Sequence, residues 1–248
     1  ILILGFNLKT KSETTYWYLL FVAISGPSAL IIYKLSGTWQ TDLGTAIWAT
    51  IAITIILFAL ISFIFPFARP LGPLICSYLI FLGIIGIIWD GSSKNHSETF
   101  NLSGVWIWIH IVLCLITYGL ITISAIASLC ATYQENSFKE KLKNPINSKL
   151  PSVIDCDTIV VRLLTVSEVI LGLGLISGMT IEYFKYQHFL SINHKTIFVI
   201  SAFIIIGTLL ILHSLIGVRG RRAARYVLSA HLLLTLGYLG VKFISSVL

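Results

Sequence analysis

Charged side chains are scarce in this sequence. Asp, Glu, Lys and Arg make up 11% of the 248 residues, whereas 56% of the residues are hydrophobic. A soluble domain of this length cannot bury so much apolar surface, so the composition excludes a soluble globular protein. The apolar residues form continuous runs of about 20, and a run of that length in lipid must be a helix, because its backbone has to satisfy its own hydrogen bonds. We therefore expect an all-α, polytopic helical membrane protein.

Motifs for hydrolysis and for phosphate or metal binding are also missing. The sequence has no G-x-S-x-G, no Gly-rich phosphate loop, no H-E-x-x-H and no cluster of carboxylates, so we do not expect an enzyme. Its four cysteines lack C-x-x-C spacing, which predicts small buried residues and not a zinc site or a disulfide framework. The net charge of +7 does not indicate nucleic-acid binding, because the basic residues are spread over short loops between apolar runs.

The apolar runs predict seven full transmembrane helices. Before them, residues 1–8 ("ILILGFNL") are too short to cross a bilayer. We expect this stub to be the end of a further helix, eight in total, although a cleaved leader would leave the same stub. The chain then forms one integrated membrane domain, in which a polar cytoplasmic linker (133–157) joins N-terminal helices (1–132) to C-terminal helices (158–248). The predicted segments cover residues 16–35, 43–65, 71–89, 104–132, 158–181, 195–216 and 225–245.

Basic residues are divided unequally between the two sides of this predicted bundle. Alternating loops place twelve of the 17 lysines and arginines on the side of the 133–157 linker. Cytoplasmic loops of membrane proteins carry an excess of Lys and Arg. We therefore expect a protein of the bacterial inner membrane, or of an organellar inner membrane, with its basic loops on the cytoplasmic side.

Two histidines flank a basic turn in "LHSLIGVRGRRAARYVLSAHL", residues 212–232. From this turn, His213 lies about 6 Å and His231 about 9 Å into the membrane at the helical rise per residue, so the two side chains could meet in the interior. An imidazole in hydrocarbon needs a partner for each ring nitrogen, either a hydrogen bond to a neighbouring helix or an iron atom. Ligation of a b-type haem by both histidines is one interpretation. The other is that His213 is interfacial and His231 hydrogen-bonds another helix.

The arginines of this turn are open to the same two interpretations. They lie about one helical turn from the histidines, where guanidinium groups could bind haem propionates as bidentate donors. They also anchor the topology by staying on the cytoplasmic side, whatever else they do. The candidate propionate ligands are Arg219, Arg221 and Arg222.

The predicted helix 158–181 carries two further features. Glu168 is the one carboxylate deep in an apolar run, which makes it a functional candidate because an unpaired carboxyl in lipid is costly. Arg162, six residues earlier, does not share its helix face, so we expect a hydrogen-bond partner on another helix; proton handling is the alternative. Gly174 and Gly178 have the spacing that lets two membrane helices approach closely.

The order of motifs in the second half of the chain resembles a known family. "WIHIVLCLITYGLITISAIASLCATYQE" is followed by a Lys-rich linker, "LPS", "LGLGLISGM", "HKTIFVISAF" and "GVRGRRAARYVLSAHLLLTLGYLGVKF". Over about residues 104–246 this arrangement is similar to the cytochrome c assembly protein family of CcsA-, ResC- and HemX-like membrane proteins, and most closely to its smaller YpjD-type branch. The most specific features are His110 with Tyr118 eight residues later, and the Arg-Gly-Arg-Arg turn.

The resemblance implies that the protein handles haem for attachment to apocytochrome c at the outer face. It implies an external haem ligand at His110 and a ligand of haem within the membrane at His213. The chain departs from the pattern where full members carry a Trp-rich outer motif, because it reads "EYFKYQHFLSINHKT" there. The usual second ligand beside His110 is missing too, and His188 and His194 are the local substitutes.

Two functions are therefore expected from the sequence. The first is a haem-binding or haem-delivering membrane protein of cytochrome c maturation, surrounded by membrane lipid and working with other membrane proteins of an assembly or respiratory complex and with apocytochrome c. The second is an accessory or scaffold subunit that keeps the fold without haem, which the missing Trp-rich motif favours.

Overall fold

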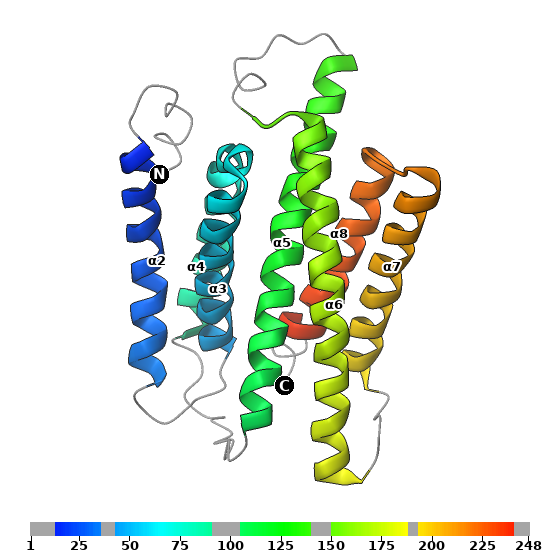
Figure 1. Ribbon diagram of the computed structural model, residues 1–248. Coiled ribbons are helices and arrows are strands. Elements are labelled where there is room, and N and C mark those ends of the chain that lie inside the picture. Colours follow the sequence, from blue (N-terminus) through cyan, green and yellow to red (C-terminus); the bar gives the residue numbers. More distant parts are fainter. Residues whose placement is uncertain (1–12, 36–42, 91–104, 140–149, 188–192, 241–248) are drawn as a thin grey trace.

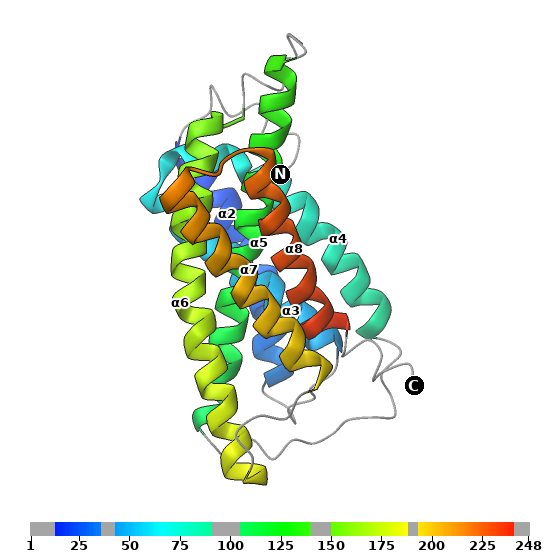
Figure 2. The same cartoon turned by 90° about the vertical axis from the view of Figure 1, so that its right-hand side faces the viewer.

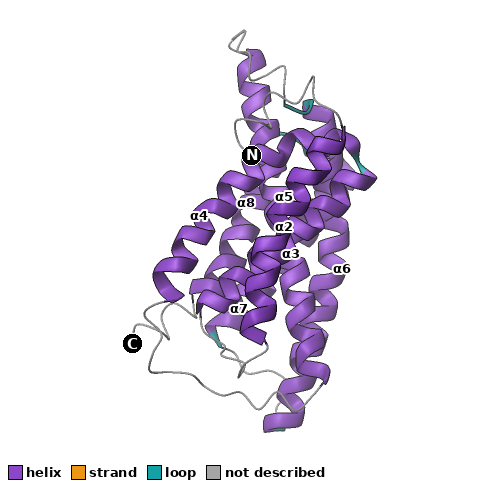
Figure 3. Ribbon diagram, turned by 90° about the vertical axis from the view of Figure 1, so that its left-hand side faces the viewer, coloured by secondary structure: helices purple, strands orange, loops and turns teal. Residues whose placement is uncertain are grey.

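The described part of the chain is entirely helical. A computed structural model describes residues 13–35, 43–90, 105–139, 150–187 and 193–240, and within these ranges there is no strand (Figure 3). A short 3-10 helix, η1, joins α3 to α4, and a π-helical turn, η2, continues α8. The prediction of an all-α fold is confirmed. The elements are α2 (Glu13–Leu35), α3 (Leu43–Ile64), η1 (Pro66–Leu71), α4 (Gly72–Asp90), α5 (Val105–Lys139), α6 (Val153–Tyr186), α7 (His194–Ile216), α8 (Arg221–Thr235) and η2 (Leu236–Gly240).

Six of these helices, α2 to α7, are long and apolar enough to cross a membrane. This supports an integral membrane protein. The segment made by α8 and η2 is shorter and begins with arginines, so the seventh span, 225–245, stays a prediction. The stub at 1–8 lies outside the described residues. Both α5 and α6 extend into the range expected for the linker, of which residues 140–149 are not described.

Helix α5 is at the centre of the bundle and contacts α3, α4, α6 and α8 (Figures 1 and 2). All twelve residues from 117 to 128 on this helix are buried. Small side chains help here: a Cβ on Gly119 would lie 2.8 Å from Leu57 Cδ1 and 3.4 Å from Thr54 Cα, so this glycine favours the close packing of α3 on α5. Several buried hydroxyls donate to carbonyls of their own helix, as Thr122 Oγ1 does to Tyr118 O at 2.8 Å.

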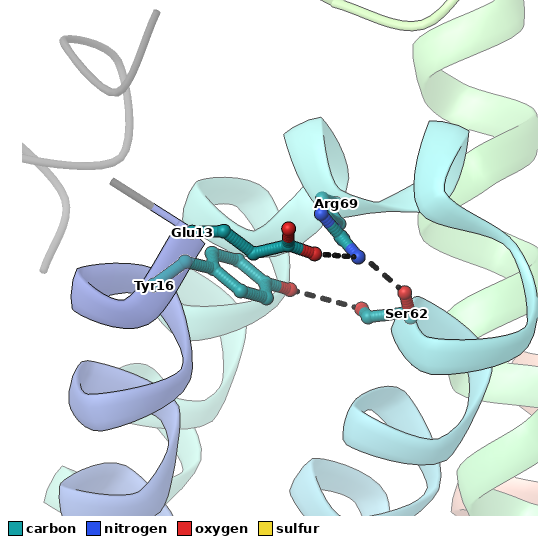
Figure 4. A network of polar contacts seen from close by, with 4 residues as sticks. All are labelled: Glu13, Tyr16, Ser62 and Arg69. Carbon is teal, nitrogen blue, oxygen red and sulfur yellow. Dashed lines mark hydrogen bonds and ion pairs between the residues drawn. The ribbon is translucent and has the colours of Figure 1, made fainter. Parts of the chain in front are cut away.

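Helix α2 packs mainly on α3 and is held at one end by a polar cluster (Figure 4). Arg69, in η1, binds Glu13 Oε1 at 2.9 Å and donates from Nε to Ser62 O at 3.3 Å. The Tyr16 hydroxyl donates to Ser62 Oγ at 2.9 Å. The guanidinium carbon of Arg69 lies 5.7 and 5.6 Å from the ring centroids of Tyr16 and Trp17. Arg69 therefore fixes the start of α2 against the turn after α3.

The turn between α3 and α4, the facing ends of α5 and α6, and the turn between α7 and α8 all lie at one end of the bundle (Figure 1). These are the connections to which the sequence assigned most of its basic residues. The cytoplasmic location of this end stays a prediction. We call it the basic end, and it contains Arg69, Lys139, Arg219, Arg221 and Arg222.

All four cysteines are free. Cys76, Cys130 and Cys156 are buried, as expected for small packing residues. Cys114 is half-buried beside His110.

Candidate functional site

The predicted site residues lie at separate places in the bundle. His110 is near the start of α5, whereas His213 is near the end of α7, which is the opposite end of the bundle (Figure 1). His231 lies within α8 and Glu168 midway along α6. Over the described residues, no three His, Cys, Asp or Glu side chains come close enough to hold a metal ion. Each predicted site residue therefore has its own separate surroundings.

The ring of His110 is held by α6. Its Nδ1 is 2.8 Å from Ser177 Oγ, and the Ser177 hydroxyl donates its one proton to Gly174 O at 2.8 Å. Ser177 can then only accept from the imidazole, so Nδ1 carries the proton and Nε2 keeps its lone pair. The polar atom beside Nε2 is Cys114 Sγ at 3.6 Å, a weak donor.

A glycine makes room for this ring. A Cβ on Gly178 would lie 3.1 Å from His110 Cε1, so the glycine lets α5 and α6 approach at this point. A Cβ on Gly174, by contrast, would have no described atom within 4 Å, and this glycine contributes its carbonyl to Ser177. The close approach expected from the glycine spacing is thus present at Gly178. His194 begins α7 at the same end of the bundle and is exposed, while His188 lies outside the described residues.

His213 has the same tautomer for a different reason. Gly217 ends α7 in the left-handed conformation, with φ of 69°, and its N–H donates a hydrogen bond to His213 O. The chain then turns back, and Val218 O lies 3.0 Å from His213 Nδ1. A carbonyl oxygen only accepts, so Nδ1 is the donor and Nε2 again keeps its lone pair. The side chain is half-buried at the basic end.

His231 has the opposite tautomer. Its Nε2 is 3.1 Å from Thr122 Oγ1, whose proton is already donated to Tyr118 O. Nε2 must therefore carry the proton, and the lone pair is on Nδ1. The rings of Tyr78 and Tyr118 lie beside the imidazole, with centroids 6.0 and 5.5 Å away.

Hydroxyl groups join α4, α5 and α8 around this histidine. Thr235 Oγ1 donates to His231 O at 2.8 Å, so it must accept from the Tyr118 hydroxyl at 3.1 Å. Tyr118 in turn accepts from Tyr78 at 3.2 Å. His231 is thus a hydrogen-bonded contact between helices, as one interpretation of the sequence expected. Single Tyr and Thr residues are common in apolar runs, and no pattern in the sequence indicated that Tyr78 and Thr122 would meet His231.

The structure does not bring His213 and His231 together. No hydrogen bond or ring contact joins these two described side chains. His213 bonds back to the turn that follows it, whereas His231 points toward α5. Similar depth along neighbouring helices did not determine the direction in which each side chain points.

The basic turn is bound by a carboxylate from α5. Helix α8 begins after Gly220, which has no side chain to cap it. Glu135 supplies the missing acceptor, because its carboxylate accepts a hydrogen bond from the backbone N–H of Arg221. Its Oε2 also lies against Gly220, where an added Cβ would be only 2.6 Å away. Lys139 Nζ binds the other carboxylate oxygen at 2.6 Å. A negative charge at the start of a helix is stabilising, so Glu135 joins α5 to α8.

A second carboxylate binds the turn from α6. Arg219 Nε lies 3.2 Å from Asp157 Oδ2. Arg222 and Arg225 are exposed, and the structure shows no ion pair for either with a described residue. Both Glu135 and Asp157 fall in the linker predicted at 133–157. Acidic residues in a chain with a run of arginines were the signal that could have identified them.

Glu168 faces α7 without a partner among the described residues. A Cβ on Gly207 would lie 3.1 Å from Oε1, so this glycine makes room for the carboxyl. Oε2 is buried and has no hydrogen bond within the described ranges. Arg162 points elsewhere, with its guanidinium carbon 5.0 Å from the Phe65 ring centroid. The interhelical hydrogen bond expected for Glu168 is therefore not formed in the part of the chain that the structure describes.

The chain belongs to the cytochrome C assembly protein family, whose model matches residues 14–248. This confirms the family that the motifs resembled and extends the match into the first half of the chain. Membership supports a role in cytochrome c maturation. A protein of Azospirillum brasilense, described as an uncharacterized 28.8 kDa protein in a nifR3-like 5′ region, is 40% identical over 233 residues, which are 94% of this chain and 86% of that protein. No solved structure matches significantly, and the YpjD-type branch stays a prediction.

Proposed function

We propose that the protein binds haem during cytochrome c maturation, with His110 and His213 each offering Nε2 to the iron. The observation that carries this proposal is their shared tautomer. In both residues Nδ1–H donates a hydrogen bond to a protein oxygen, which is Ser177 Oγ for His110 and Val218 O for His213. A hydrogen bond at one ring nitrogen is how proteins orient an imidazole that binds metal through the other.

Haem, when bound, supplies the iron that these nitrogens would ligate and the porphyrin that the family attaches to apocytochrome c. Because His110 and His213 lie at opposite ends of the bundle, each would serve a separate site. His231 does not fit the same role, since its Nε2 proton is donated to Thr122. Arg219, Arg221 and Arg222 remain the candidate propionate partners near His213, although Arg219 is bound to Asp157 and would have to exchange partners.

The second candidate function is an accessory or scaffold subunit without haem. It is favoured by the structural use of the basic turn, which Glu135 and Asp157 join to α5 and α6. Arginines with such contacts stabilise the fold whether or not haem is present. Other membrane proteins of an assembly or respiratory complex, and surrounding lipid, are the expected partners of either function.

Haem content of the purified protein separates these functions. We expect a b-type haem signal in a reduced-minus-oxidised spectrum of protein from haem-replete cells. His213→Ala should lower haem per chain at least roughly tenfold at the basic-end site, because the only protein nitrogen proposed for that site is lost. His96→Ala, at a position outside the described residues, is the first control. His231→Gln is the control within a helix, since an amide still donates to Thr122.

Equal haem content in His213→Ala and His96→Ala would contradict the ligand assignment. A silent spectrum in the unmodified protein would favour the accessory function. If haem is present and His110→Ala removes a second fraction of it, two separate sites are supported.

A further inference from the structure

Helix α8 has one buried and one exposed side, and the exposed side changes from charged to apolar along the helix. Its buried side packs into the bundle through Ala223, Ala224, Val227, Ala230 and Leu234. The opposite side is at the surface of the bundle (Figure 2). Its exposed residues recur every three or four positions, as one face of a helix requires. They form the α8 stripe: Arg222, Arg225, Ser229, Leu232 and Leu236.

The two ends of the α8 stripe differ in chemistry. Arg222 and Arg225 are at the basic end, and Leu232 and Leu236 are 59% and 44% exposed further along the helix. Ser229 between them adds little polarity, because its hydroxyl donates to Arg225 O at 2.7 Å. The stripe therefore presents two cations followed by an apolar surface.

No carboxylate of the described residues neutralises these two arginines. Glu135 is occupied by Lys139 and the start of α8, and Asp157 by Arg219. Guanidinium groups at a membrane surface are stabilised by anions, and they bind phosphate through two parallel N–H bonds. Arg222 and Arg225, three residues apart, can converge on one such group.

The length of the stripe matches one leaflet. Leu236 is eleven residues beyond Arg225, or about 16 Å along the helix, and half of a hydrocarbon core is about 15 Å. We propose that the α8 stripe binds an anionic phospholipid of the leaflet at the basic end. Its phosphate is held by Arg222 and Arg225, and an acyl chain lies along Leu232 and Leu236.

This site does not depend on haem binding. A haem propionate could also bind Arg222, but it would make no contact with the exposed leucines, which lie about one leaflet's depth further along the helix. A free phosphate ion would use the arginines alone. The amphiphile is the ligand that uses the whole stripe.

Retention of phosphatidylglycerol in native mass spectrometry tests the site. The full chain is reconstituted in nanodiscs that contain phosphatidylglycerol and phosphatidylcholine, released into detergent, and weighed with its bound lipid. Arg222→Gln/Arg225→Gln should bind phosphatidylglycerol roughly 30-fold more weakly, since each arginine near the headgroups contributes a factor of several. Arg222→Lys/Arg225→Lys keeps the charge and should retain most binding.

The matched control is Arg162→Gln. Arg162 is also an exposed arginine above exposed apolar residues, but it already contacts Phe65. Phosphatidylglycerol retention should not change in this variant, and phosphatidylcholine retention should not change in any. Equal loss in Arg162→Gln, or unchanged retention in Arg222→Gln/Arg225→Gln, overturns the proposal. So does a double glutamine variant that keeps phosphatidylglycerol but loses added haem, because the arginines then bind propionates.

Discussion

Gly220→Ala is expected to destabilise the protein by roughly 2–4 kcal/mol, a large effect for a single methyl group. Gly220 has φ of 63° and ψ of −137°, a conformation that only glycine adopts without strain. A Cβ there would also lie 2.6 Å from Glu135 Oε2. Alanine would thus strain the backbone and push away the carboxylate that caps α8. Thermal unfolding in detergent measures the loss.

Gly217→Ala is the matched control, three residues earlier in the same connection. Gly217 also has a positive φ, 69°, but its ψ of 36° is in the left-handed helical region, and no described atom lies within 4 Å of a Cβ there. Its substitution should cost about 1 kcal/mol. Equal losses for the two alanine variants would contradict both the extra backbone strain and the Glu135 contact assigned to Gly220. Glu135→Gln should fall between them, because it weakens the cap without straining the turn.

Glu168→Leu is expected to make the protein more stable. Oε2 of Glu168 is buried and has no hydrogen-bond partner in the described residues. An unsatisfied buried polar atom costs roughly 1–3 kcal/mol, which an apolar side chain of similar size recovers. The melting temperature in detergent should therefore rise by several degrees.

The control for this prediction is Glu168→Gln. An amide keeps polar atoms at the same place and should leave stability near that of the unmodified protein. A fall in melting temperature for Glu168→Leu with no change for Glu168→Gln would contradict the prediction and reveal a hydrogen-bond partner. Gly207→Ala tests the same contact from α7, where a Cβ 3.1 Å from Oε1 must displace the carboxyl slightly.

Helix ends were predictable where they coincide with the end of an apolar run. The run expected at 195–216 is α7, His194–Ile216, and the run at 43–65 is α3, Leu43–Ile64. Helix α5 was expected to end at 132 but continues to Lys139. Hydrophobicity indicates where an apolar run ends. The polar residues "YQENSFK" that follow can still form a helix in water. The helix therefore extends beyond the apolar run.

The positions of the histidines along their helices were predictable, but their partners were not. Their positions follow from counting residues along a helix, whereas a partner depends on rotation about the helix axis and on packing between helices. His213 bonds Val218 because Gly217 reverses the chain, and His231 bonds Thr122 because α8 packs on α5. Glu168 is the clearest example. The free-energy cost of an unpaired carboxyl in lipid predicted a hydrogen-bond partner, and none of the described residues provides one.

The hydrogen bonds around His231 also determine what that cluster can conduct. From Tyr78 to Tyr118 to Thr235 every hydroxyl donates in the same direction, and the run ends on the backbone carbonyl of His231. The branch through Thr122 ends on the carbonyl of Tyr118. A backbone carbonyl accepts a hydrogen bond but has no proton to pass on, so neither of these two bonds continues a relay. Hydroxyl groups therefore brace three helices of the bundle without forming a proton relay among the described residues.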